Sequence, residues 1–143
     1  MKKATYILLL FPLLFLSCEI EMSDNGKLDG NWQLQTIDTL STGGVCDMTR
    51  SCIYWGIENH LLQVKNTEKG EKILFRFEQE KNMLTIHSPH VIKSQYETVP
   101  VEDENLLLPF GINSTEEAFV MEHISNSEMV LSSELLRLHF RKY

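Results

Sequence analysis

Residues 72–79 read KILFRFEQ, and apolar and polar side chains alternate along this stretch with little interruption. Successive side chains of a β-strand point to opposite faces, so Ile73, Phe75 and Phe77 fall together on one side. Lys72, Arg76 and Glu78 fall on the other side. The pattern predicts a strand with one buried and one exposed face, which needs partner strands to cover its apolar side.

Segments of similar character lie on both sides of this strand, separated by turn signals about every 8–12 residues. Gly70 closes one such turn, where glycine adopts a positive φ without strain. The apolar piece at 106–110 is predicted to be a strand end or a plug over a barrel mouth, and 114–124 suits a strand or a helical turn. Further strands are predicted at residues 31–38, 52–57, 60–65, 83–87, 91–96, 128–132 and 135–142.

The strands predict an all-β fold, a small up-and-down antiparallel β-barrel of about eight strands. Strands with one apolar face each can hide these faces together by closing into a barrel, and closure also removes the unpaired edges. The chain shows no sustained heptad, internal repeat or long helical pattern that competes with this interpretation. We expect the barrel to occupy residues 28–143 as one domain.

The tripeptide Gly30-Asn31-Trp32 opens the first predicted strand, and residues 124–131 and 136–143 form a closing pair. Together these segments resemble the lipocalin-like lipoproteins of Bacteroides and relatives. The resemblance implies a lipocalin-like barrel over roughly residues 27–143. It also implies that Gly30 and Trp32 form the barrel-closing signature, with Arg137 as the basic residue that caps the tryptophan. It implies no particular substrate.

The chain begins with Lys2 and Lys3, followed by an almost wholly apolar run at residues 4–16. This run is shorter than the roughly 20 residues that a spanning helix needs, but it suits the apolar region of a signal peptide. Ser17 precedes Cys18 in an arrangement that resembles a lipobox, which implies cleavage before Cys18 and attachment of lipid to it. An ordinary secretory signal cut elsewhere is the alternative.

Residues 18–27 are acidic and poor in core-forming side chains, so we expect a flexible tether behind the lipidated cysteine. An N-terminal lipid with two or more chains holds a protein on a membrane without spanning it. We therefore expect a location in the cell envelope, at the outer membrane, on either the periplasmic face or the cell surface. The membrane is the first predicted partner.

The formal net charge is −7, and removal of residues 1–17 with their two lysines makes it −9. An acidic domain is a poor candidate for nucleic acid, whose phosphates require a basic face. The 126 residues that remain are enough for one domain and one core. A net charge this far from zero favours solubility of the domain.

With Cys18 assigned to lipid, Cys46 and Cys52 remain as a pair in an oxidising compartment, where a disulfide is the favoured interpretation. A metal site would need further ligands. His87 and His90 suggest zinc, but Pro89 between them implies a turn and no close carboxylate or cysteine completes a set, so we expect no metal.

The aromatic and aliphatic residues of the alternating strands either line an apolar pocket or merely fill the barrel. The candidate pocket comprises Trp55, Phe75, Phe77, Leu138 and Phe140. No recognisable catalytic or phosphate-binding motif is present, so we expect neither a cofactor nor an enzymatic activity. The favoured hypothesis is a binding protein for a small apolar or amphipathic ligand inside the barrel. The alternative is an accessory module that contacts another envelope protein through its outer surface or the 39–50 loop.

Overall fold

The computed structural model describes residues 24–143, and its regular elements are short strands joined by tight turns. The strands are β1 (Gly30–Thr39), β2 (Val45–Asp47), β3 (Ile53–Glu58), β4 (Leu61–Asn66), β5 (Glu71–Glu80), β6 (Met83–Ser94), β7 (Glu97–Pro100), β8 (Glu117–Ile124), β9 (Glu128–Ser132) and β10 (Leu136–Lys142). Three 3₁₀ turns, η2 (Gly26–Leu28), η3 (Glu104–Leu106) and η4 (Leu108–Phe110), complete the described elements. None of the helical turns within residues 24–143 is long and apolar enough to cross a membrane.

Eight of the strands form a closed antiparallel barrel, which confirms the predicted fold class. The order is β1-β3-β4-β5-β6-β8-β9-β10, and β10 pairs with β1 to close the ring. The short strands β2 and β7 add to β1 and β6 outside this path. Closure leaves each strand of the ring paired on both sides, so no long edge is exposed.

The barrel interior holds one continuous apolar core, built from the inward positions of the alternating strands. On β5 these positions are Ile73, Phe75 and Phe77, as the alternation of residues 72–79 predicts. Facing them from other strands are Trp32, Leu34, Ile53, Trp55, Ile57, Leu62, Val64, Leu84, Ile86, Phe119, Met129, Leu131, Leu138 and Phe140. The core thus receives residues from all eight strands of the ring.

The turn predicted at Ser88-Pro89 is wrong, because β6 runs without a break from Met83 to Ser94. Arg76 pairs with His87 and Leu74 pairs with His90, so β6 carries a bulge between these two pairs. Ser88 has a φ of 55°, which bends the strand locally. Pro89 has no backbone N–H to donate, and a bulge interrupts the ladder at the place where this donor is missing.

Two ambiguous segments are settled by the structure. Residues 106–110 do not end a strand; they belong to η3, η4 and the turn between them, and Leu107 and Phe110 are fully buried. The helical alternative for residues 114–124 is wrong, because β8 occupies Glu117–Ile124 and pairs with β6 and β9.

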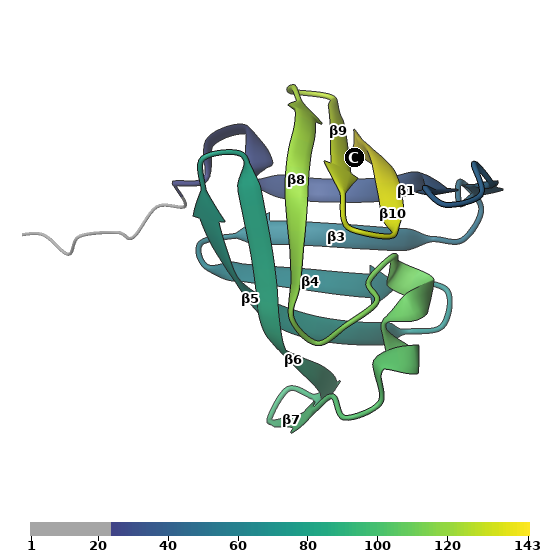
Figure 1. The fold of residues 1–143 in the computed structure, drawn as a ribbon. Coiled ribbons are helices and arrows are strands. Elements are labelled where there is room, and N and C mark those ends of the chain that lie inside the picture. The colour runs from purple at the N-terminus through teal and green to yellow at the C-terminus, as the bar shows by residue number, and fades with distance from the viewer. Residues whose placement is uncertain (1–23) are drawn as a thin grey trace, which may run out of the picture.

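The two ends of the barrel are covered by different segments (Figure 1). η2 lies where β1 begins, and we call this the closed end. The helical turns η3 and η4 lie at the opposite end, near the far ends of β3 and β4, and we call this the mouth. The predicted signal peptide, Cys18 and most of the predicted tether precede residue 24 and lie outside the described residues.

Candidate functional site

The five residues of the candidate pocket do come together inside the barrel, but they belong to the packed core. Trp55, Phe75 and Leu138 have no exposed surface, and Phe77 and Phe140 are almost fully buried. The ring of Trp55 packs at 5.6 Å from Phe119 and 5.0 Å from Phe140, measured between centroids. Tilted and edge-to-face contacts of this kind are the arrangements that aromatic rings prefer in cores.

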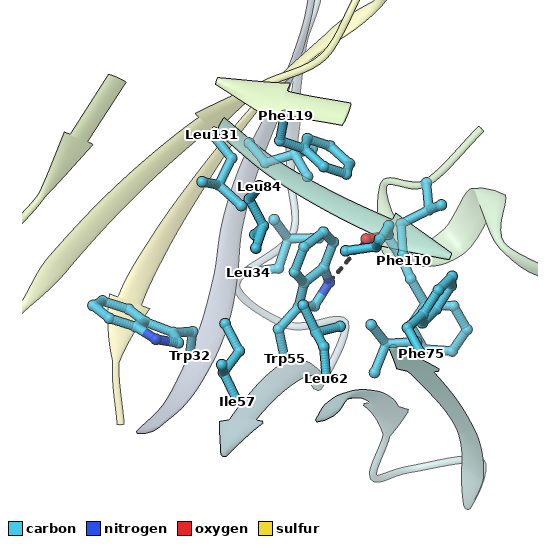
Figure 2. Packing of buried hydrophobic residues seen from close by; sticks show 14 of the residues in the cluster. Trp32, Leu34, Trp55, Ile57, Leu62, Phe75, Leu84, Phe110, Phe119 and Leu131 are labelled. Atoms are coloured by element: carbon cyan, nitrogen blue, oxygen red, sulfur yellow. Dashed lines mark hydrogen bonds between the residues drawn. The ribbon is translucent and has the colours of Figure 1, made fainter. Parts of the chain in front are cut away.

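The mouth is filled by the chain itself (Figure 2). Residues 101–112, which we call the plug, contribute Leu107, Phe110 and Ile112 to the buried core. The indole Nε1 of Trp55 donates a hydrogen bond to the carbonyl oxygen of Phe110 at 3.1 Å. Side chains of the plug therefore stand where a ligand of an open calyx would enter.

A glycine lets the plug come close to the barrel wall. Gly111 has a φ of +82°, and a Cβ at this position would lie 2.8 Å from Cδ2 of Leu138. A larger residue would need both a strained backbone and a displaced Leu138. The plug and the candidate pocket thus form one packed unit.

At the closed end, Trp32 is fully buried and its Nε1 donates to the carbonyl oxygen of Leu28 at 2.9 Å. The prediction that Arg137 caps this tryptophan is wrong. The cation over the ring is Lys142, whose Nζ lies 4.9 Å from the ring centroid. Arg137 instead forms an ion pair with Glu122, 2.6 Å between Nε and Oε2, on the outer surface.

The reason for this difference is the strand register. Trp32 pairs directly with Lys142, whereas Arg137 pairs with Asp38 at the far end of β1. Gly30 supports the lysine: it has a φ of +132°, and a Cβ there would lie 2.6 Å from Cε of Lys142. The capping residue is thus the basic residue at the very end of β10, opposite Trp32 in the register. The tripeptide Gly30-Asn31-Trp32 alone does not give this register.

The structure does not contain the predicted disulfide, because Cys46 and Cys52 are both free thiols. Cys46 lies on β2 opposite Ile37, and its Sγ is 3.6 Å from Sδ of Met48. Cys52 follows the turn, has a φ of 55°, and directs its Sγ towards the carbonyl oxygen of Arg50. Short spacing in sequence does not bring the two sulfur atoms together, since β2 pairs with β1 while Cys52 leads into β3.

The two histidines of the β6 bulge both form hydrogen bonds with Ser88, one with its hydroxyl group and one with its backbone carbonyl. Nδ1 of His87 lies 2.8 Å from Oγ of Ser88, and Nδ1 of His90 lies 2.9 Å from the carbonyl oxygen of Ser88. Within residues 24–143, no group of three or more histidine, cysteine or acidic side chains is arranged to hold a metal ion.

A hollow of about 710 Å³ opens on the outer face of the barrel, over β1, β3, β4 and β5. Its floor is a row of paired positions, Asn31, Gly56, Gln63 and Leu74, that crosses four strands. Gly56 has no side chain, so nothing rises from the sheet at this point of the row. We call this feature the Gly56 hollow.

The walls of the Gly56 hollow combine charged and aliphatic side chains. Glu58 and Leu61 lie on one side and Lys65 on the other. Beyond Lys65, whose Nζ is 5.7 Å from the ring centroid of Tyr54, partial burial raises the pKa of the Tyr54 phenol. The alternating pattern of residues 52–57 does not reveal this site, and the available signal is a glycine inside an otherwise β-forming segment.

Comparison with known proteins places the chain in a family. Residues 13–143 match the model of the lipocalin-like domain. Because the match covers most of the chain, the protein belongs to the lipocalin-like domain family, as the Gly30-Asn31-Trp32 resemblance indicates. No curated protein matches the chain.

Two solved structures have the same fold. A lipocalin-like protein from Bacteroides uniformis ATCC 8492 has a TM-score of 0.63 at 19% sequence identity, and the match covers 82% of this chain and all of that one. An uncharacterized protein from Bacteroides eggerthii DSM 20697 has a TM-score of 0.59 at 18% identity, covering 80% and 98% of the two chains. At these identities the likeness carries the barrel architecture only.

Proposed function

We propose that the protein is a non-enzymatic binding module of the cell envelope, and that it binds its ligand on the outer face of a filled barrel. Lipocalin-like architecture supports a binding role. The observation that carries the outer location is the burial of Leu107, Phe110 and Ile112 in the mouth. A ligand inside the barrel would have to displace these side chains, whereas the Gly56 hollow is already open.

The proposal includes a lipid anchor at Cys18. Ser17-Cys18 after an apolar run supports it, as does the short tether that separates the cysteine from the barrel. Replacement of Cys18 by Ala tests the anchor by fractionation: the wild-type chain should sediment with membranes, and C18A should not carry a fatty-acyl label. Labelled C18A protein would contradict attachment at this residue.

The proposal that the ligand binds outside the barrel is tested by native mass spectrometry. The full chain is purified in detergent from the cell envelope of its source organism and freed of detergent in the gas phase. We expect the mass of the lipidated polypeptide without an apolar companion. A fluorescent fatty-acid probe should likewise remain unbound. A copurified apolar molecule that leaves on denaturation would contradict the outer site.

That contrary result would support a second candidate, a small apolar ligand that replaces the plug. The observation in its favour is the cluster of Trp55, Phe119 and Phe140 rings next to the plug. Under this alternative, the hydrogen bond from Trp55 to Phe110 must break on binding, so the fluorescence of Trp55 should change when a fatty acid is added.

A protein partner at the mouth is the third arrangement with a specific observation behind it. Leu40, Val45 and Leu135 are 41%, 69% and 53% exposed. Leu40 donates a backbone hydrogen bond to Leu135, so the 39–50 loop and the β9–β10 turn form one apolar surface. Cross-linking that retrieves one envelope protein, and fails when Leu40 and Val45 are both replaced by Ser, would favour this arrangement.

A further inference from the structure

Gly56 lies in the middle of β3 at a position where the fold does not require glycine. It is not among the residues with positive φ. A Cβ at this position would meet only Oδ1 of Asn31 at 3.7 Å and the carbonyl oxygen of Gln63 at 3.8 Å, which are ordinary contacts. Glycine inside a strand costs about 0.5–1 kcal/mol relative to alanine. Gly56 pairs in register with Asn31 and Gln63, so no bulge explains it, and close approach of a ligand is one of the common reasons for a strand glycine.

The position of Gly56 agrees with this reason, because it forms the floor of the outer hollow. Its neighbours in the row are Asn31 on β1 and Gln63 on β4. The volume, about 710 Å³, lies within the range of roughly 300–1,000 Å³ that small-molecule sites occupy. The hollow is therefore large enough for one or two small rings.

An unsatisfied polar atom lies beside the glycine. Oδ1 of Asn31 is buried and has no hydrogen-bond partner among the described residues. A buried acceptor left unpaired costs about 1–3 kcal/mol. Oδ1 lies next to Gly56, 3.7 Å from the place where a Cβ would stand, so a rotation of the amide on binding would present it to a hydroxyl group in the hollow.

We propose that the Gly56 hollow binds a neutral sugar ring, an inference that rests on the outer binding site proposed above. Asn31 and Gln63 provide planar amides that donate and accept, which matches neighbouring hydroxyl groups. Leu61 on the wall and Leu74 on the floor provide aliphatic contacts for the C–H face of the ring. An anionic sugar fits less well, because Glu58 lines the hollow and the chain carries a net charge of −7.

A peptide fits this site less well than a sugar does. Extended peptides bind to sheets through unpaired backbone at a strand edge. β3 is paired with β1 and β4, and β4 is paired with β3 and β5, so the floor of the hollow presents no such edge. Recognition here depends on side chains alone, as suits a small hydroxyl-rich ligand.

The test is an amide NMR titration of the ¹⁵N-labelled full chain in a detergent without a sugar headgroup. The probes are glucose, galactose, mannose and N-acetylglucosamine. We expect one of them to shift the backbone amide signals of Asn31, Gly56 and Gln63, with a dissociation constant on the order of 1 mM. Gly56→Val fills the floor with a good strand former and should weaken binding by at least about tenfold.

Two further variants make the result specific. Gln63→Leu nearly keeps the volume of this floor residue and removes the amide, and it should also weaken binding, by about fivefold. Ser132→Val introduces valine on the outer face of β9, outside the hollow, and should leave the dissociation constant unchanged.

Absence of shifts at the hollow with all four sugars at about 50 mM, well above a millimolar dissociation constant, would overturn the sugar assignment. Equal binding by wild type, Gly56→Val and Gln63→Leu would overturn it as well. Neither result bears on the outer location itself, since the mass-spectrometric search for an apolar ligand inside the barrel decides that point independently.

Discussion

Two neighbouring tryptophans inside the barrel each donate from the indole to a backbone carbonyl, Trp32 to the segment at the closed end and Trp55 to the plug at the mouth, but the two contacts differ in range. Trp32 and Trp55 pair directly across β1 and β3. Trp32 donates to Leu28, four residues before it, whereas Trp55 donates to Phe110, 55 residues after it. One contact is local in the chain and the other depends on the complete fold.

This difference decides how each end can open. The closed end is held by a short segment, one cation and a glycine with an unusual φ, all close to Trp32 in the strand register. The mouth is held by the burial of large apolar side chains from a segment without strand pairing. Burial should therefore dominate the stability of the mouth, and conformational strain and charge should dominate at the closed end.

The largest effect is expected for Phe110→Ala at the mouth. Removal of a fully buried phenylalanine costs about 3–5 kcal/mol in the free energy of unfolding when the plug is part of the core. Urea unfolding followed by tryptophan fluorescence measures this loss. Leu108→Ala is the matched control, because Leu108 lies on the same turn and is 48% exposed, and it should change stability by less than about 0.5 kcal/mol.

A small loss for Phe110→Ala, together with uptake of a fatty-acid probe, would show instead that the plug is a displaceable lid. The segment at the closed end would then be part of the folded core, whereas the plug at the mouth would not. The proposed outer binding site would lose its main argument in that case.

Gly30→Ala should produce the next largest effect, at the closed end. The φ of +132° is strained for any residue with a Cβ, which costs about 1–3 kcal/mol, and the new Cβ would push Lys142 away from Trp32. Gly56→Ala provides the comparison, since its φ is ordinary and its Cβ meets no close atom, so its stability should be equal or slightly higher. Thermal unfolding of both variants measures the difference. Equal losses at the two positions would show that the strain at Gly30 is relieved by movement of the backbone.

The local features of this fold could be predicted from sequence, and the features set by register or distant contacts could not. The alternation at 72–79 predicts β5 and its buried face, and Gly30-Asn31-Trp32 indicates the family. The capping residue is predicted as Arg137 but is Lys142. Both are basic residues of β10, and only their pairing with β1 shows which one lies opposite Trp32. The disulfide prediction is wrong because an even number of cysteines in an oxidising compartment does not by itself bring their sulfur atoms together.

The candidate site shows the same limit. The pocket residues are inside the barrel as predicted, but an apolar lining and an apolar filling have the same sequence pattern. The plug was foreseen as one of two interpretations of residues 106–110, whereas its contact with Trp55 was not. The Gly56 hollow appears only when neighbouring strands are set in register, because its floor is a row of four residues from four strands.

Lys142→Met tests the part of the closed end that depends on charge. A cation over a tryptophan contributes about 0.5–2 kcal/mol, and methionine keeps most of the apolar stem. Arg137→Met removes the cation of an exposed ion pair on the same strand, where the expected loss is at most about 1 kcal/mol and diminishes at high salt. Denaturant unfolding at low and high salt distinguishes the two. A larger loss for Arg137→Met would reverse the assignment of the capping residue.

The smallest effect is expected at acid pH, in the loop beside the mouth. The backbone N–H of Thr49 and its hydroxyl donate to Oδ1 of Asp47 at 2.9 and 2.7 Å, and they lower the pKa of this carboxyl below its usual value of 3.8. A lowered pKa in the folded state means that the charged form stabilises the turn. That contribution is complete above the unfolded pKa and is lost as the pH falls through the folded pKa. Titration of the Asp47 carboxyl carbon by NMR between about pH 5 and pH 2 measures the shift, with the amide signal of Thr49 as reporter. Asp47→Asn removes the titrating group, so the Thr49 signal should then no longer follow pH. If Asp47 instead titrates at its usual value, the hydrogen bonds from Thr49 do not favour the charged carboxylate. Pairing of β2 with β1 then holds this turn alone, and acid should not destabilise it.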